Sequence, residues 1–126
     1  MNLTLAISIF NKKHESDLKA IQDGNSYTFI VDEEEIGSLN MTANISNCGI
    51  LDLHYLESKS KDNRALILNF AKTFAASNSR NILTYNTAEY QGELIRSLKE
   101  AKFHTFNKKF RNKNSKSKIQ FHVVEI

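Results

Sequence analysis

The sequence contains no proline, no tryptophan, four glycines and one cysteine in 126 residues. A single cysteine, Cys48, excludes an internal disulfide and is typical of a protein from a reducing compartment. No apolar run reaches the roughly 20 residues that span a bilayer. The apolar stretch at 3–10 is not preceded by the basic segment that begins a signal peptide. We therefore expect a cytoplasmic protein without a membrane partner.

The composition is that of one globular domain. Hydrophobic residues make up 40% of the chain and charged residues 25%, and the chain is long enough to bury its own core. No linker or internal repeat divides the sequence, so we expect a single domain over residues 1–126. The four histidines and Cys48 are scattered without the spacing of metal ligands, so no metal site is expected.

Apolar periodicity predicts the elements of a mixed α/β fold. Alternation predicts strands at 2–10, 27–31 and 36–45, and a short helix capped by Asn11 is predicted to end at Gly24. The later elements are a charged hairpin tip at 32–35, a turn at 47–49, a strand at 50–57, helices at 63–77 and 88–101, a strand at 81–85, and closing strands at 103–110 and 119–124, joined by a polar turn at 112–117. Because the unit over 50–85 is a strand–helix–strand crossover, its two strands should be parallel. The sequence predicts a mixed sheet of about seven strands flanked by helices.

Four segments carry a family resemblance. They are Ile36-Gly37-Ser38-Leu39, Leu51-Asp52-Leu53, Ile82-Leu83-Thr84-Tyr85 and Leu98-Lys99-Glu100-Ala101-Lys102-Phe103. The first three resemble the third, fourth and fifth strands of the GCN5-related N-acetyltransferases, the GNAT family, and the last resembles that family's closing Tyr-x-x-x-Gly-Phe pattern. The resemblance implies a divergent or degenerate GNAT fold. It also implies transfer of an acetyl group from acetyl-CoA to an amine-bearing small molecule or protein.

The resemblance also implies a site for acetyl-CoA, between the strands at 50–57 and 81–86. The residues that it implies for this site are Leu53, Lys59, Lys61, Asn63, Arg64 and Gln91. In the family, glycines bring backbone N–H groups to the pyrophosphate at a helix N-terminus, but the loop at 58–64 here contains none. Its two lysines and Arg64 could hold phosphate through side-chain charge instead. The alternative is an ordinary solvated loop in which Asp62 or Asn63 caps the helix.

Two polar residues of the strand at 50–57 are candidates for the chemistry. Asp52 and His54 are two positions apart and share one face, where a carboxylate beside an imidazole could deprotonate an amine, whereas Glu57 should point to the opposite face. The alternative is an exposed strand surface without a chemical role. The tyrosine that protonates the leaving thiolate in many family members falls at Leu98, and Tyr90 lies two turns earlier on the predicted helix.

A basic stretch at 102–118 favours a different function. Seven lysines and arginines occur there without an acid, and Phe103, Phe106 and Phe110 lie among them. Such a segment can bind single-stranded nucleic acid by stacking and phosphate contacts, although lysines also protect edge strands and can steer an anionic ligand. The alternative function is therefore a non-catalytic binding or assembly module for nucleic acid or an acidic partner. The sequence is also compatible with a homodimer.

Overall fold

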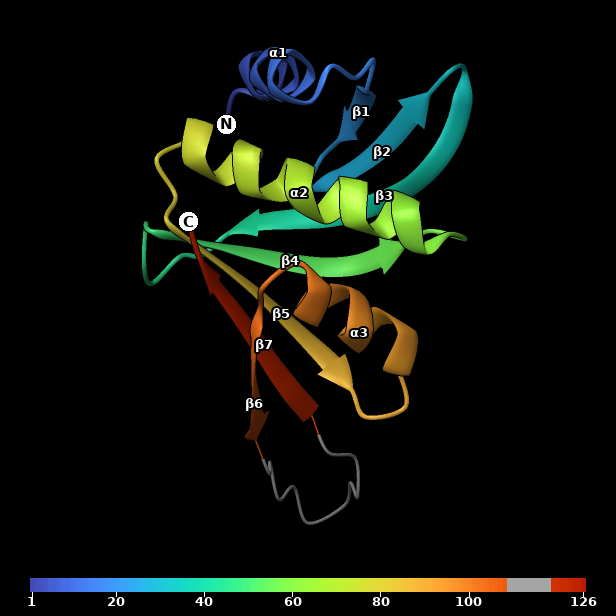
Figure 1. Ribbon diagram of the computed structural model, residues 1–126. Coiled ribbons are helices and arrows are strands. Elements are labelled where there is room, and N and C mark those ends of the chain that lie inside the picture. The colour runs from blue at the N-terminus through green and yellow to red at the C-terminus, as the bar shows by residue number, and fades with distance from the viewer. Residues whose placement is uncertain (109–118) are drawn as a thin grey trace.

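The structure, a computed structural model, describes residues 1–108 and 119–126 (Figure 1). Its elements are α1 (Leu3–His14), β1 (Lys19–Asp23), β2 (Ser26–Val31), β3 (Glu34–Ala43), β4 (Ile50–Glu57), α2 (Lys61–Ser77), β5 (Ile82–Ala88), α3 (Gly92–Glu100), β6 (His104–Lys108) and β7 (Ile119–Glu125). The seven strands form one sheet in the order β1-β2-β3-β4-β5-β7-β6. Only β4 and β5 are parallel within this sheet. The predicted α/β class, the mixed sheet and the parallel crossover are confirmed.

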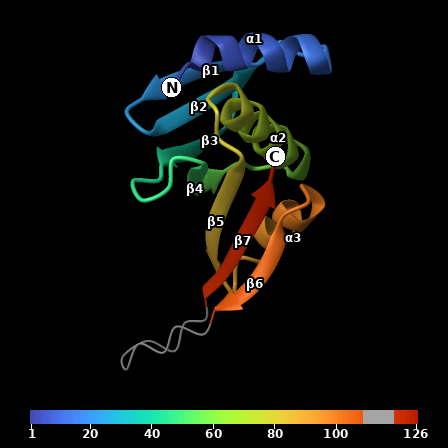
Figure 2. The same ribbon diagram turned by 90° about the vertical axis from the view of Figure 1, so that its left-hand side faces the viewer.

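The three helices lie on one face of the sheet, with α2 between α1 and α3 (Figures 1 and 2). Aromatic rings fill the layer between α2 and the sheet. The Phe70 ring lies 5.7 Å from Phe10 of α1 and 5.3 Å from Phe29 of β2, and Phe74 lies 5.4 Å from Tyr27. Burial of these rings stabilises the fold, since each removes a large apolar area from water. No helix in the described part of the chain is both long and apolar enough to cross a membrane.

The first element is a helix, so the strand predicted at 2–10 is wrong. Asn2 caps α1 by accepting a hydrogen bond from the Leu5 amide, and Ala6 and Phe10 are buried. These two residues are four apart, which is one helical turn, whereas Leu5 and Ile9 stay 47% and 42% exposed. Apolar residues occur in this run at the two-residue spacing of a strand and also at the spacing of a helix. The run forms a helix because its buried face packs on α2.

The second predicted helix, at 11–24, is also wrong. Glu15 ends α1 in the left-handed conformation, with φ of 49°, and the chain continues into β1. The Asn11 side chain accepts from the Leu18 amide at 2.9 Å and donates to the Leu18 carbonyl at 2.9 Å, which stabilises the reversal. β1 then pairs with β2 through a two-residue turn at Gly24, whose φ is 61°. That glycine followed by asparagine is a hairpin signal and predicts a strand on either side of it.

The predicted helix at 63–77 is confirmed, but it begins earlier. Ser60 is the N-cap of α2 and accepts a hydrogen bond from the Asn63 amide at 3.0 Å, so the predicted caps at Asp62 or Asn63 are wrong. Asp62 lies in the first helical turn, where a carboxylate favours the positive end of the helix dipole. The helix predicted at 88–101 begins only at Gly92, which places Tyr90 in the preceding loop.

The closing strands at β6 and β7 are confirmed within the described residues, whereas Phe110 and the turn at 112–117 lie outside them. β7 carries His122, which is fully buried. Its Nε2 lies 2.8 Å from the Thr87 hydroxyl and its Nδ1 lies 2.9 Å from the Thr105 hydroxyl. Burial, with the nearby positive charge of Lys99, lowers the pKa of His122. This imidazole joins three strands through hydrogen bonds that a neutral ring can make on both nitrogens.

Candidate active site

The parallel strands β4 and β5 separate part of the way along. Four residue pairs join them, from Ile50 with Ile82 to Leu53 with Tyr85. Beyond that point, within residues 1–108 and 119–126, β4 pairs only with β3, while β5 pairs only with β7. The sheet therefore opens into a wedge between residues 54–57 of β4 and residues 86–88 of β5.

A bulge in β4 lies beside this wedge. On β3 one residue lies between Ser38 and its ladder neighbour Asn40, but on β4 two residues lie between their partners Glu57 and His54. The extra residue is Tyr55, which has φ of 52° and a 76% exposed side chain. Because the bulge shifts the alternation by one, Glu57 shares a face with His54, and the prediction that it points to the opposite face is wrong.

Tyr85 closes the narrow end of the wedge. Its side chain is 4% exposed, and its phenolic oxygen accepts a hydrogen bond from the Leu56 amide at 2.7 Å. Since β5 has already turned away there, this side chain satisfies an amide that has lost its strand partner. Burial raises the pKa of Tyr85, and Glu57 and Tyr55 raise it further, against the lowering effect of the Leu56 amide.

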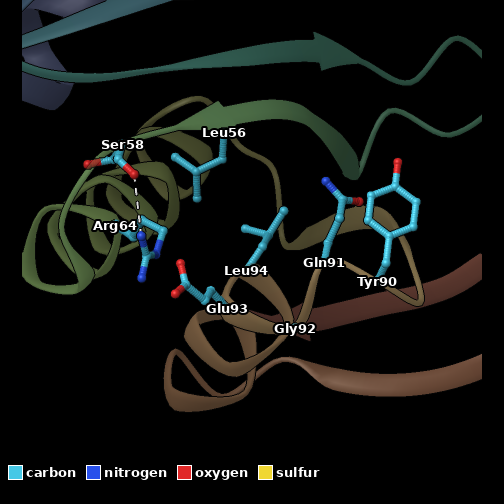
Figure 3. Close-up of a pocket in the computed structure, with 8 residues that line it drawn as sticks. All are labelled: Leu56, Ser58, Arg64, Tyr90, Gln91, Gly92, Glu93 and Leu94. Carbon is cyan, nitrogen blue, oxygen red and sulfur yellow. Dashed lines mark hydrogen bonds between the residues drawn. The ribbon is translucent and has the colours of Figure 1, made fainter.

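On the helix side of the wedge is a cavity of about 360 Å³. Figure 3 shows it between the start of α2, with Ser58 and Arg64, and the loop that leads into α3, with Tyr90 and Gln91. The Arg64 guanidinium donates to the Ser97 hydroxyl at 3.0 Å and to the Ser58 carbonyl at 3.3 Å. The Gln91 side-chain oxygen accepts from the Ala88 amide at 2.8 Å, which holds the loop. The structure thus brings two of the predicted cofactor-binding residues to one cavity.

The other predicted cofactor-binding residues are placed differently. Lys59 and Asn63 line a separate cavity of about 820 Å³, which shares Leu56 and Ser58 with the first. Lys61 forms an exposed ion pair with Glu100 of α3, with a distance of 3.2 Å between Nζ and Oε1. Leu53 is fully buried at the last parallel pair.

The loop from residue 58 to residue 64 keeps negative φ values at all seven positions. Its lack of glycine therefore introduces no backbone strain. What changes is the surface presented by the loop, which carries lysine side chains where glycine would let the backbone approach a ligand.

Asp52 and His54 line a third cavity, of about 310 Å³, on the sheet face away from the helices. The Asp52 carboxylate accepts from the Asn44 amide group at 3.0 Å and from the Thr84 hydroxyl. Among the described residues these are its hydrogen bonds, and none comes from His54. Asn86 of β5 lines the same cavity, so it reaches the open side of the wedge. The predicted pair shares a face, but the carboxylate orients towards Asn44 and Thr84.

The two positions weighed for a tyrosine acid are both unsuited to it here. Leu98 is fully buried in the core between α3 and the sheet. Tyr90 lies in the loop before α3 and is 89% exposed. The tyrosine at the wedge is Tyr85, which sequence reasoning assigned only to a strand. Its signal was its place at the carboxyl end of a parallel strand, where ligand sites of open α/β sheets form.

No family model matches the sequence, and no curated protein matches it. Solved structures do resemble it. An acetyltransferase of the GNAT family from Streptococcus pneumoniae has 16% identity and a TM-score of 0.62, over 94% of this chain and 73% of that one. A candidate GNAT acetyltransferase from Desulfovibrio desulfuricans has 16% identity and a TM-score of 0.64, over 79% of this chain and 67% of that one.

A third similar structure includes a ligand. It is a candidate acetyltransferase from Salmonella typhimurium with its cofactor acetyl-CoA, with 8% identity and a TM-score of 0.62, over 79% of this chain and 63% of that one. These likenesses extend over 79–94% of this chain at 8–16% identity. The chain has the fold of the GNAT acetyltransferases.

Proposed function

We propose that the protein is an acyl-CoA-dependent N-acyltransferase, which moves an acetyl group from acetyl-CoA to an amine. The observation that carries this proposal is the wedge between β4 and β5, with one cavity on the helix side and another on the open face. Such a wedge lets a donor and an acceptor meet from opposite faces of the sheet, which supplies the proximity that a bimolecular transfer requires.

The residues around the helix-side cavity suit acetyl-CoA. Arg64 and Glu93 contribute one charge of each sign to its lining, and Ser58 and Gln91 contribute neutral polar groups. The N-terminus of α2 adjoins this cavity through Ser58, and its dipole favours a phosphate. Lys59 is exposed on the same loop and supplies further positive charge. Acetyl-CoA, when bound, supplies the activated thioester.

The open-face cavity suits the amine. His54 lies on its wall next to the wedge and is the candidate base, while Asp52, held by Asn44 and Thr84, supplies negative charge two residues away. In the transfer, the amine nitrogen bonds to the carbonyl carbon and the carbon–sulfur bond breaks. The electron pair of that bond leaves with sulfur, which takes a proton from water, and His54 receives the proton that the nitrogen loses.

A thermal-shift titration with acetyl-CoA and with CoA tests the proposal. A ligand that binds only the folded chain stabilises it by about 2.7 kcal/mol at 100 times its Kd, so a saturable rise in melting temperature is expected. The double variant Lys59→Glu, Lys61→Glu should weaken binding by at least about 100-fold, since two charge-assisted hydrogen bonds are lost at about 1.5–3 kcal/mol each.

A matched control is the double variant Lys12→Glu, Lys13→Glu, which makes the same charge change in the last turn of α1. It should bind acetyl-CoA as the parent protein does. No rise in melting temperature at millimolar acetyl-CoA and CoA would contradict the proposed function. Equal weakening by both double variants would show that only the net charge matters and that the loop holds no phosphate.

A second candidate function is a binding module that retains the fold without the chemistry. Two internal contacts favour it, because the Lys61–Glu100 ion pair and the Arg64–Ser97 hydrogen bond engage cations that a phosphate would need. Its surface would be the basic segment 102–118, most of which lies outside the described residues. Binding to single-stranded nucleic acid that weakens steeply with rising salt, without any response to CoA, would favour this candidate.

We also propose a cytoplasmic location, because the exposed free thiol of Cys48 suits a reducing compartment.

A further inference from the structure

The hydroxyl of Tyr85 has a proton that its strand contacts leave unused. In the described part of the chain, the phenolic oxygen accepts from the Leu56 amide and donates to no other group. A phenol can accept and donate at the same time. Because an accepted hydrogen bond polarises the O–H bond, the Leu56 amide makes this hydroxyl a better donor than a free phenol.

The position of the hydroxyl directs that donor to the wedge. Leu53 and Tyr85 are the last parallel pair, and the Tyr85 side chain extends from there to the amide three residues further along β4. Leu56 is also part of the wall of the helix-side cavity. The hydroxyl is therefore hydrogen-bonded to a residue of the cavity wall, beside the last parallel pair of β4 and β5.

We propose that the Tyr85 hydroxyl donates a hydrogen bond to the thioester carbonyl oxygen and stabilises the negative charge that develops there during acyl transfer. This inference rests on the proposed function and names a residue for it. Acyl transfer requires a fixed donor aimed at that oxygen, usually a backbone N–H or a side chain. At this bulge the Leu56 amide already donates its hydrogen bond to Tyr85. The donor available to the carbonyl oxygen is therefore the Tyr85 hydroxyl instead of the Leu56 amide.

Burial of Tyr85 favours the role of a hydrogen-bond donor over that of a proton-transferring acid. Burial raises the pKa of the phenol above its ordinary value of 10.0, so the hydroxyl stays protonated at neutral pH. Full proton transfer to a thiolate, whose conjugate acid has a pKa of about 8.5, would run uphill. A buried phenol that keeps its proton is instead suited to hydrogen-bond a developing oxyanion.

Infrared difference spectroscopy of acetyl-CoA labelled with ¹³C at the thioester carbonyl tests this role without an acceptor. Bound to the parent protein, the carbonyl band should move to lower frequency than in water, and Tyr85→Phe should abolish that movement. Tyr27→Phe is the matched control, since it removes another buried phenol on the same sheet face, next to Phe74 and away from the wedge. It should leave the band where the parent protein places it.

A second measurement covers the case in which Tyr85→Phe folds poorly. Uniform incorporation of 3-fluorotyrosine makes the phenol more acidic and a stronger donor, so the carbonyl band should move further in the same direction. Once an acceptor is known, Tyr85→Phe should lower kcat by about 10²- to 10³-fold with little change in KM.

The outcomes separate this inference from the proposed function. Acetyl-CoA binding with a carbonyl band that neither Tyr85→Phe nor fluorotyrosine moves would overturn the role of Tyr85 and leave the transferase proposal intact. An unchanged or higher kcat in Tyr85→Phe would show that the freed Leu56 amide is the donor and that Tyr85 merely covers it. Absence of acetyl-CoA binding by the parent protein would overturn both.

Discussion

Gly37 of β3 lies against the end of β4, and a methyl group at this position would collide with the backbone. A Cβ atom there would be 2.4 Å from the Glu57 carbonyl oxygen, 2.7 Å from the Ile67 Cδ1 atom and 3.0 Å from the Ser58 Cβ atom. The end of the Ile67 side chain can move, but the carbonyl belongs to the paired strand. The φ of 157° at Gly37 adds a second cost, because side-chain-bearing residues rarely adopt it.

These two costs give the expected size of the effect of Gly37→Ala. Overpacking costs about 1–3 kcal/mol, and a sparsely populated backbone conformation costs about 1–3 kcal/mol. The substitution should lower the free energy of unfolding by about 2–6 kcal/mol, a large part of the 5–15 kcal/mol of a typical domain. Urea unfolding followed by far-ultraviolet circular dichroism measures this difference as a lower midpoint.

Gly92→Ala is the matched control for this prediction. Apart from its chain neighbours and the backbone of its own helix, no atom of the described residues lies within 4 Å of a Cβ atom at Gly92, and the residue begins α3. Alanine there should be neutral or stabilise the protein by up to about 1 kcal/mol. The reasoning is refuted if Gly37→Ala unfolds within about 0.5 kcal/mol of the parent protein, or if both alanine variants lose the same stability.

Two further predictions concern groups outside the wedge. Burial and Lys99 lower the pKa of His122 in the folded protein below 6.5, so the unfolded chain binds that proton more tightly. The contribution of neutral His122 to the free energy of unfolding is therefore fully present above pH 6.5. It falls as the pH drops from there towards the folded-state pKa, by at most about 1.4 kcal/mol per pH unit. Urea midpoints at several pH values should show this slope, and His122→Asn should remove it; an unchanged slope would assign it to other groups. Asn11→Ala removes hydrogen bonds to Ser16 and Leu18 and should cost about 1–3 kcal/mol in the same assay. A loss below about 0.5 kcal/mol would show that water replaces these bonds.

The sequence predicted the elements from residue 26 onward because the apolar spacing of each one fits either a helix or a strand, but not both. α2 repeats buried residues such as Ile67, Phe70, Ala71 and Phe74 at three- and four-residue spacing, which no strand can match. β4 and β5 are short apolar runs on either side of that helix, so a parallel crossover was the only simple arrangement. Tertiary packing merely adjusted the ends of these elements.

The N-terminal region could not be predicted in the same way. Its apolar residues at 3, 5, 7 and 9 alternate as a strand would, and helix packing buries a different set from the same run, Ala6 and Phe10. The cap and stop residues also predicted a helix between the first two strands, whereas the structure has a two-residue turn there. A short-range signal, Gly24 followed by asparagine, was the better guide.

For the candidate site, the sequence located the loop but not its contacts. Composition cannot show that Lys61 pairs with Glu100 or that Arg64 reaches Ser97, because those partners lie more than 30 positions away in the chain. Nor can it show that an extra residue in β4 turns Glu57 to the face of His54, since the bulge is defined by register against β3.

The connectivity of the sheet has a consequence for how the chain folds. Each pairing from β1 to β4 joins strands that follow one another in the chain, so this half can form by successive hairpins with little loop entropy to overcome. β5 reaches β4 only across α2, and β7 inserts between β5 and β6. The four-pair joint between β4 and β5 is therefore expected to be among the last contacts made. The wedge and its two cavities would then be completed late in folding, when β1–β4 and β5–β7 come together.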